Sequence, residues 1–138
     1  MSSERELSGK HAVITGGGRG IGAAIAQRLA EQGARITVMG RTRDVLEARA
    51  ETLRALTEIN CETVDVGDAA SVEAAFAAAV RRLGPVSILV NNAGQAGSAP
   101  FVKTDPALWQ QMLSVNLTGT YLGTRAALPD MLDRKSVV

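Results

Sequence analysis

The chain has 138 residues, of which 46% are hydrophobic and 21% charged, and its formal net charge is +1 at pH 7. These values are typical of one globular domain over 1–138, and the near-neutral charge with two Phe, one Trp and one Tyr argues against a nucleic-acid surface. No run approaches the roughly 18 apolar residues of a membrane helix, and the first residues lack a signal peptide's apolar segment. We therefore expect a cytoplasmic protein that binds neither nucleic acid nor a membrane.

Four short apolar runs predict buried β-strands, because continuous apolar runs are typical of parallel strands covered on both faces. They lie at 11–15, 35–39, 61–66 and 86–90. Cys61 begins the third run and is expected to be a small buried packing residue rather than a reactive thiol. His11 has no cysteine or second histidine near it in the sequence, so we expect no metal site and interpret it as a strand-edge residue.

The segments between these runs carry apolar residues at helical spacing. The residues expected to face inward are Ile21, Ile25 and Leu29 in a helix from 20 to about 32, then Leu46, Ala50, Leu53 and Leu56, then Val72, Phe76, Val80 and Leu83. Gly33 follows the first helix as a C-cap glycine. Asp68 or Ser71 caps the third helix, and Gly84 with Pro85 ends it.

The last third of the chain predicts a polar loop followed by helices. The loop begins with Asn-Asn-Ala-Gly at 91–94, and helices are predicted over 106–114 and from 115 to about 133. Pro129 should kink the last helix or end its regular part. Residues 136–138 look like the first steps of a fifth strand.

Alternating strands and helices with right-handed crossovers predict an α/β fold, a doubly wound (Rossmann) parallel sheet with helices on both faces. We expect the strand order 3-2-1-4, truncated before the fifth strand, with the fourth strand left as an open edge. The last helix would also lack part of its cover, which predicts association through its apolar residues. These residues are Leu117, Tyr121, Leu122 and Leu128.

Residues 15–22 read Thr-Gly-Gly-Gly-Arg-Gly-Ile-Gly, directly after the first predicted strand and at the start of a helix. Glycines let backbone N–H groups approach a pyrophosphate, and the helix offers its positive end to the same group. A merely flexible turn is the alternative for a bare glycine cluster, but the strand and helix around this one predict a dinucleotide phosphate loop. Its predicted ligand-binding residues are Gly16, Gly18, Arg19, Gly20, Ile21 and Gly22.

Arg41 follows the second strand, about 20 residues after the glycine loop, where NAD sites place an acid that accepts a hydrogen bond from the ribose 2′-hydroxyl. An arginine there can instead pair with a 2′-phosphate, and Arg19 supplies a second cation. No acidic residue lies between Arg35 and Arg43. Solvated surface charge is the alternative for both arginines, but their positions favour NADP(H) as the cofactor.

Four motifs, in this order and spacing, resemble the short-chain dehydrogenase/reductase family. They are Thr15-Gly16-x-x-x-Gly20-x-Gly22, Asp65-Val66, Asn91-Asn92-Ala93-Gly94, and Asn116 within a helix. The match runs from about Leu7 to Asp133 and covers only the amino-terminal part of the family's domain. The resemblance implies a nicotinamide cofactor and hydride transfer between it and a carbonyl or secondary alcohol.

The resemblance also implies roles for residues outside the glycine loop. Asp65 and Val66 would border the adenine, and Asn92, Ala93 and Gly94 would border the cofactor's ribose. A helix cap is the alternative for Asp65, and an Asx turn for the two asparagines. Asn116 corresponds to the family residue that anchors a water in the proton relay.

The family's catalytic Ser and Tyr-x-x-x-Lys have no counterpart in the 138 residues, since the one tyrosine, Tyr121, is followed four residues later by Arg125. A cation at this spacing can lower a tyrosine pKa, but the family geometry makes Tyr121 a packing position. Ser114 and Ser136 lack a matching context. We therefore expect the chain to be inactive by itself.

Three functions stay open at this point. The chain is an incomplete NADP(H)-dependent short-chain oxidoreductase, a catalytically inactive NADP(H)-binding module, or an interaction subunit that a second chain completes. As partners we expect a small-molecule carbonyl or alcohol substrate and a homo-oligomer, formed through the last helix, which is a common interface in the family, or through the open sheet edge.

The sequence indicates almost nothing about the substrate, because only residues 95–102 could contribute a wall to its pocket. A small ketone, a β-ketoacyl thioester, a sugar or a steroid all stay open. The stretch 91–116 loosely resembles β-ketoacyl thioester reductases.

Overall fold

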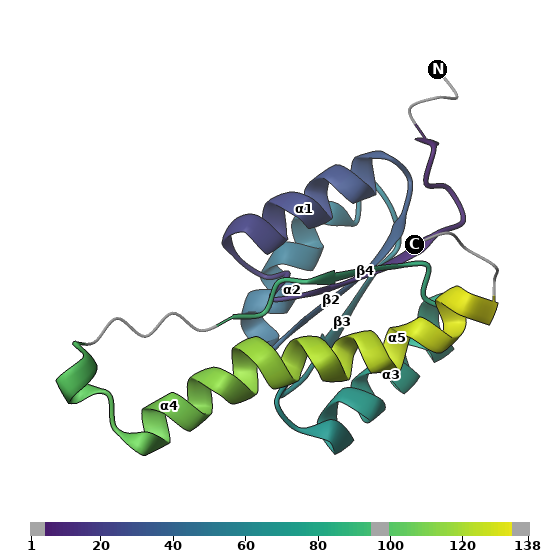
Figure 1. Ribbon diagram of the computed structural model, residues 1–138. Helices are drawn as coiled ribbons and strands as arrows, with labels where there is room; N and C mark the ends of the chain where they lie inside the picture. The colour runs from purple at the N-terminus through teal and green to yellow at the C-terminus, as the bar shows by residue number, and fades with distance from the viewer. Residues whose placement is uncertain (1–4, 95–99, 134–138) are drawn as a thin grey trace.

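A computed structural model describes residues 5–94 and 100–133, which form a four-stranded parallel sheet with helices on both faces (Figure 1). The strands are β1 (His11–Thr15), β2 (Arg35–Gly40), β3 (Ile59–Thr63) and β4 (Ile88–Asn91). Their order is β3-β2-β1-β4, and every neighbouring pair is parallel. The predicted fold class and strand order are therefore confirmed. Residues 136–138, which include Ser136 and the predicted start of a fifth strand, lie outside the described residues.

Two pairs of helices cover the sheet. Helices α1 (Gly20–Glu31) and α2 (Arg43–Leu53) lie on one face, and α3 (Ala69–Leu83) and α5 (Gly119–Asp133) lie on the other (Figure 1). Since successive strand residues point to opposite faces, Ile14 packs in the core beneath α1 and α2, whereas Val13 packs in the core beneath α3 and α5. The two cores hold β1 at the centre of the domain. None of the helices in the described part of the chain has the length and apolar character needed to cross a membrane.

The prediction that Ile21 faces inward is wrong, since its side chain is 73% exposed. The face of α1 that is buried consists of small residues, namely Gly22, Ala23, Ala26 and Ala30. Small residues let the helix approach the strands closely, and a larger residue on this face would push the helix away from the sheet. Helical spacing alone could not distinguish these two neighbouring faces of α1.

The predicted boundaries of two strands are also corrected. Strand β3 begins and ends earlier than the predicted 61–66, because its register on β2 starts at Ile59 and the chain turns after Thr63. Strand β4 begins later than 86–90, because the Val86 N–H donates to the Asp130 carboxylate at 3.0 Å rather than to a strand. Hydrogen-bond partners, not apolar residues alone, decide where each strand begins.

His11 is fully buried, so the prediction that it is a strand-edge residue is wrong. Its Nδ1 lies 2.8 Å from the Gly84 carbonyl oxygen and its Nε2 lies 2.8 Å from Thr37 Oγ1. Burial lowers the pKa of His11, and the charge of Arg35 lowers it further, against the opposing effect of the Gly84 carbonyl. The imidazole is therefore neutral near pH 7, donating from Nδ1 to Gly84 and accepting at Nε2 from Thr37.

The capping predictions are resolved by two hydrogen bonds. Asp68 is the N-cap of α3, since its carboxylate accepts from the Ala70 N–H at 3.1 Å. Ser71 Oγ instead accepts from the Asp65 N–H at 2.8 Å, which fixes the turn between β3 and α3. Gly33 follows α1 with a φ of +96°, in the left-handed region that the C-cap prediction requires.

The chain after β4 continues through η2 (Phe101–Lys103), α4 (Pro106–Leu113) and the π-helical turn η3 (Ser114–Thr118) into α5. Helix α4 extends beyond the end of the sheet and continues into α5 (Figure 1). Pro129 lies inside α5. Tyr121 is 59% exposed, so it packs in neither core of the described chain, and its hydroxyl accepts a hydrogen bond from Arg125 at 3.3 Å.

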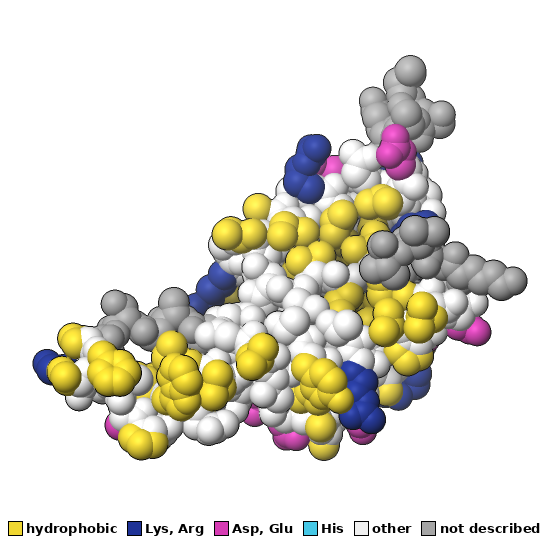
Figure 2. All heavy atoms as spheres, viewed as in Figure 1, with side chains coloured by type: hydrophobic (Ala, Val, Ile, Leu, Met, Phe, Trp, Pro, Cys, Tyr) yellow, Lys and Arg dark blue, Asp and Glu magenta, His cyan; other side chains and the backbone are white. Residues whose placement is uncertain are grey.

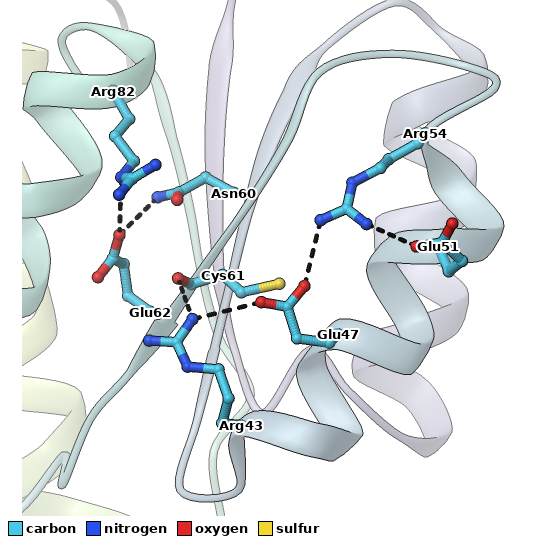
Figure 3. Close-up of polar contacts among 8 residues, drawn as sticks. All are labelled: Arg43, Glu47, Glu51, Arg54, Asn60, Cys61, Glu62 and Arg82. Atoms are coloured by element: carbon cyan, nitrogen blue, oxygen red, sulfur yellow. Dashed lines mark hydrogen bonds and ion pairs between the residues drawn. The ribbon is translucent and has the colours of Figure 1, made fainter.

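The outer strand β3 is covered by charged side chains of α2 (Figure 3). The Arg43 guanidinium donates to the Cys61 carbonyl at 3.2 Å, and Glu47 accepts from Arg54 at 3.1 Å. The Cys61 thiol is buried as predicted, and desolvation raises its pKa to about 11. The thiol is therefore protonated at neutral pH, and one edge carbonyl is satisfied within the chain.

Candidate functional site

A cleft of about 770 Å³ opens at the carboxyl ends of the strands. The loops after β1, β2, β3 and β4 form its floor, and helix α4 forms one wall. Ten of the twelve residues predicted to bind the cofactor line this cleft: Gly16, Gly18, Arg19, Gly20, Arg41, Asp65, Val66, Asn92, Ala93 and Gly94. A more open hollow of about 720 Å³, between α2 and α3, is lined by none of the predicted residues.

The glycine loop reaches the cleft in a conformation that needs glycine. Gly16 and Gly20 have φ values of +67° and +54°, in the left-handed region that L side chains rarely adopt. A methyl group at Gly22 would collide with the Gly16 carbonyl oxygen, so Gly22 shapes the loop from behind rather than lining the cleft. Ile21 does not line the cleft either. Some residues of the motif, such as Gly16 and Gly20, therefore line the cleft, whereas Gly22 leaves room for the Gly16 carbonyl behind it.

The loops after β1 and β4 are joined by side-chain hydrogen bonds. Thr15 Oγ1 accepts from the N–H groups of Asn92 and Ala93, each at 3.0 Å. The Asn92 carboxamide donates to the Gly16 carbonyl at 3.2 Å. The asparagine pattern thus has a structural role in this molecule, and it fixes the position of Ala93 and Gly94 in the wall.

Charge in the cleft is strongly asymmetric. Among residues 5–94 and 100–133, the charged residues that line it are Arg19, Arg41 and Asp65. Arg41 and Thr42 immediately precede α2, and Thr42 is the N-cap of that helix. The end of the cleft formed by the glycine loop and the β2 loop therefore favours an anion.

Asp65 lies in the β3 loop, where its carboxylate accepts from the Gly67 N–H at 3.1 Å. The alternative that Asp65 caps a helix is wrong, since Asp68 caps α3. One carboxylate oxygen is held by the turn while the residue still lines the cleft. This end of the cleft can accept a hydrogen bond from a ligand's amino group.

Asn116 lies in the π-helical turn at the base of the α4 wall, next to Ser114 and Val115, which line the cleft. A methyl group at Gly94 would lie 3.2 Å from Asn116 Oδ1, so the β4 loop approaches this residue closely. Single π-helical turns within helices are frequent at functional sites. Asn116 itself is not a lining residue.

Sequence reasoning missed the α4 wall. The lining residues of this wall recur at i, i+3, i+4, i+7 and i+8, as Ala107, Gln110 and Gln111 of α4 and Ser114 and Val115 of η3, which continues it. This spacing marks one helix face, but polar and apolar members are mixed, so hydrophobic periodicity does not show it. Among residues 5–94 and 100–133, no group of three or more His, Cys, Asp or Glu side chains could hold a metal ion.

The model of one protein family, described as short chain dehydrogenase, matches residues 10–137. The NADP-dependent (R)-specific alcohol dehydrogenase of Lentilactobacillus kefiri is 38% identical over 128 residues, which are 93% of this chain and 51% of that protein. A putative ketoacyl reductase of Streptomyces coelicolor is 39% identical over 126 residues, 89% of this chain and 48% of that protein. The chain spans about half the length of these curated relatives.

Solved structures agree with this match. A metagenomic short-chain oxidoreductase in complex with NADP superposes with a TM-score of 0.89 at 35% identity, covering 95% of this chain and 60% of that one. L-Sorbose reductase from Gluconobacter frateurii, complexed with NADPH and L-sorbose, superposes with a TM-score of 0.88 at 32% identity. The superposition covers 95% of this chain and 51% of that chain.

Proposed function

This chain belongs to the short-chain dehydrogenase family, and we propose that it forms the cofactor-binding part of an NADP(H)-dependent oxidoreductase. The reaction is hydride transfer between the nicotinamide and a carbonyl or secondary alcohol carbon. One observation carries the cofactor assignment: Arg19 and Arg41 line the same cleft as the glycine loop, beside the N-terminus of α2. The names of the Lentilactobacillus relative and of the metagenomic structure, which contain NADP, support it.

The described residues fit such a cofactor. Gly16, Gly18 and Gly20 line the cleft without side chains, so backbone groups can approach a pyrophosphate there. Arg19 and Arg41 would bind the 2′-phosphate through charge-assisted hydrogen bonds. When bound, the nicotinamide supplies or accepts the hydride.

The remaining predicted site residues are part of the same proposal. Asp65 and Val66 would border the adenine from the β3 loop, and Asn92, Ala93 and Gly94 would border the ribose from the β4 loop. Asn116 would position a water for proton transfer, and its place in the π-helical turn next to Gly94 supports this role. The substrate would be a small-molecule carbonyl or alcohol, and a β-ketoacyl thioester is one candidate.

A titration of the purified chain with NADPH and with NADH, followed by nicotinamide fluorescence, tests the cofactor assignment. Arg41→Asp should weaken NADPH binding about 10- to 100-fold, the value of a lost charge-assisted bond, and should improve NADH binding. Arg81→Asp, an exposed arginine of α3 outside the cleft, is the matched control. Equal effects of Arg41→Asp on the two cofactors would exclude the assignment.

A catalytically inactive NADP(H)-binding module is the second candidate function. It is favoured by the position of Tyr121, which lies on an exposed face of α5 and does not line the cleft. Such a module would bind NADPH with the same dependence on Arg41. It would not oxidise NADPH, whichever carbonyl compound is added. Because the 138 residues are expected to be inactive by themselves under either function, assays of NADPH consumption with ketones, β-ketoacyl thioesters and sugars distinguish the two functions only when they are run on the chain combined with segments that supply the Ser and Tyr-x-x-x-Lys groups.

We also propose that the chain associates with a second copy through α4 and α5. Large apolar side chains are exposed along this part of the molecule (Figure 2). They are Phe101 and Val102 of η2, Trp109 of α4, Leu117 of η3, and Tyr121 and Leu132 of α5, each more than half exposed. Analytical ultracentrifugation should show a dimer or larger species, and Leu117→Lys should weaken this association. An interaction subunit would instead pair with a different chain.

We also propose a cytoplasmic location, as the sequence predicts.

A further inference from the structure

We propose that Gly123 and Thr124 of helix α5 are positioning residues, which set the place of Asn116 beside the cleft. They do so by holding the helix against the side chain of Asn91, the last residue of β4. This role rests on the proposed function, in which Asn116 positions a water for proton transfer. Neither Gly123 nor Thr124 lines the cleft, so both would act on the reaction only through Asn116.

The Asn91 carboxamide contacts α5 with both of its ends. Its Nδ2 donates to Thr124 Oγ1 at 3.0 Å. A methyl group at Gly123 would lie 2.8 Å from its Oδ1, too close for a real side chain, so the backbone of α5 lies directly against this oxygen. The buried glycine therefore lets the helix approach the strand, and the hydroxyl beside it fixes which turn of the helix binds the carboxamide.

A second buried glycine continues this close approach toward the cleft. A methyl group at Gly119 would lie 2.9 Å from Val66 Cγ2, in the loop after β3. Gly119 and Gly123 are one helical turn apart and therefore lie on the same face of α5, together with the buried Ala127. A face of small residues thus packs α5 against the loop after β3 and the end of β4.

Asn116 depends on this packing because it lies in the π-helical turn η3, between α4 and α5. The backbone hydrogen bonds of a π-helix join residues five apart, so the regular α-helical geometry is interrupted there. The direction of a side chain in such a turn follows from the contacts that hold the helices on either side. Gly123 follows Asn116 by seven residues, about 10 Å along a helix, and a rigid helix transmits a displacement over this length.

The approach between Asn116 and the β4 loop is close. A methyl group at Gly94 would lie 3.2 Å from Asn116 Oδ1, so a shift of α5 changes the distance between them. The loop that carries Gly94 begins directly after Asn91, and its Asn92 is bound to the Gly16 carbonyl. Asn91 therefore ties α5 to the same strand end that carries the loop opposite Asn116.

Two-dimensional NMR of the isotope-labelled chain tests this role, because the side-chain amide of Asn116 gives its own pair of signals. Asn116→Asp lacks this pair and thereby identifies it. Thr124→Val keeps the side-chain volume but removes the hydroxyl that accepts from Asn91, so it should shift the Asn116 pair. Thr124→Ser keeps the hydroxyl and should leave the pair at its wild-type position. Thr52→Val, the same substitution at an exposed position of α2, is the matched control and should change nothing.

Gly123→Ala is a second, independent variant. Its methyl group must displace the Asn91 carboxamide or the helix, so it should shift the same pair of signals. Titration of Thr124→Val and Gly123→Ala with adenosine 2′,5′-bisphosphate shows whether the rest of the cleft is intact. The affinity for this ligand should equal that of the wild type, because the glycine loop and Arg41 lie at the other end of the cleft wall from α5.

Wild-type positions of the Asn116 signals in either variant would overturn the positioning role. Lower stability in urea without such a shift is the result expected of a purely structural contact. A shift that also occurred in Thr124→Ser, or a loss of adenosine 2′,5′-bisphosphate affinity in Thr124→Val, would overturn it too. Binding of NADPH by the wild-type chain would in each case leave the proposed function standing. If the wild-type chain bound no NADPH, the proposed function would fail, and Asn116 would have no reaction to serve whatever the spectra showed.

Discussion

The side-chain amide of Asn92 donates a hydrogen bond to the main-chain carbonyl of Gly16, at 3.2 Å and across 76 residues of sequence. Beside it, Thr15 Oγ1 accepts from the N–H groups of Asn92 and Ala93. The loops after β1 and β4 are therefore joined by three hydrogen bonds at the floor of the cleft. The stability of this junction depends on the hydroxyl of Thr15.

Thr15→Val should lower the free energy of unfolding by about 1–3 kcal/mol, because two partly buried N–H groups lose their acceptor while the side-chain volume is kept. Urea denaturation followed by circular dichroism measures this change. Thr15→Ser retains the hydroxyl and should lose less. Equal losses in the two variants would show that the methyl group, not the hydrogen bonds, matters here.

Gly22→Ala should be more disruptive than its small size suggests. The added methyl group would meet the Gly16 carbonyl and the Asn92 amide, so the helix must move or the loop must open, at a cost of about 1–3 kcal/mol. NADPH affinity should fall with stability, since the same loop is proposed to bind the phosphates. The control is Gly9→Ala, where φ is +82° but no atom lies within 4 Å; it should leave NADPH affinity unchanged.

His11 is the one histidine of the chain, so its imidazole protons can be followed without assignment in a proton NMR titration. The pKa of His11 should lie below its ordinary value of 6.5, because burial disfavours the charged ring. Between the native pKa and 6.5 the unfolded chain binds more protons than the folded chain. The free energy of unfolding should therefore rise with pH through this window and fall on acidification below about 6.5.

The matched variant for this pH dependence is His11→Gln, which can donate to the Gly84 carbonyl and accept from Thr37 without titrating. Its stability should vary less between pH 5 and 7 than that of the wild type. A native His11 pKa at or above 6.5 would contradict the interpretation of a buried, neutral ring.

Cys61 should resist thiol reagents in the native state. Desolvation raises its pKa to about 11, so little thiolate forms at pH 8, and the side chain is buried. Maleimide labelling followed by mass spectrometry should modify the chain only in denaturant, at its single cysteine. Rapid labelling of the folded chain would show that the β3 edge opens more easily than the contacts of Arg43 and Glu47 indicate.

Several local features could be predicted from the sequence because they depend on nearby residues. The glycine loop, the Asp68 cap and the Gly33 turn require particular residue types at particular positions, and the structure has each of them. The strand order follows from the alternation of strands and helices, since right-handed crossovers leave few arrangements. Ten of the twelve predicted cofactor residues line one cleft for the same reason, because parallel strands deliver their loops to one edge.

Other features depended on partners far away in the sequence. Ile21 was predicted to face inward because isoleucine is apolar, but the space under α1 admits only small residues. The place of His11 beside the first strand predicts a strand-edge residue, but its partners Thr37 and Gly84 are 26 and 73 residues away in the sequence and meet it only in the folded chain. Gln110 and Gln111 line the cleft, but polar residues at helical spacing form no hydrophobic pattern from which a cleft wall could be predicted.

The sequence by itself determined the family, the sheet order and the glycine loop, because these depend on local backbone requirements and on the order of elements along the chain. Only the tertiary structure decided that Arg19, Arg41 and Asp65 share one cleft with a wall supplied by α4. It also decided that Asn92 is tied to Gly16. The physical reason is that contacts between distant residues depend on the packing of helices against the sheet, which local residue preferences do not specify.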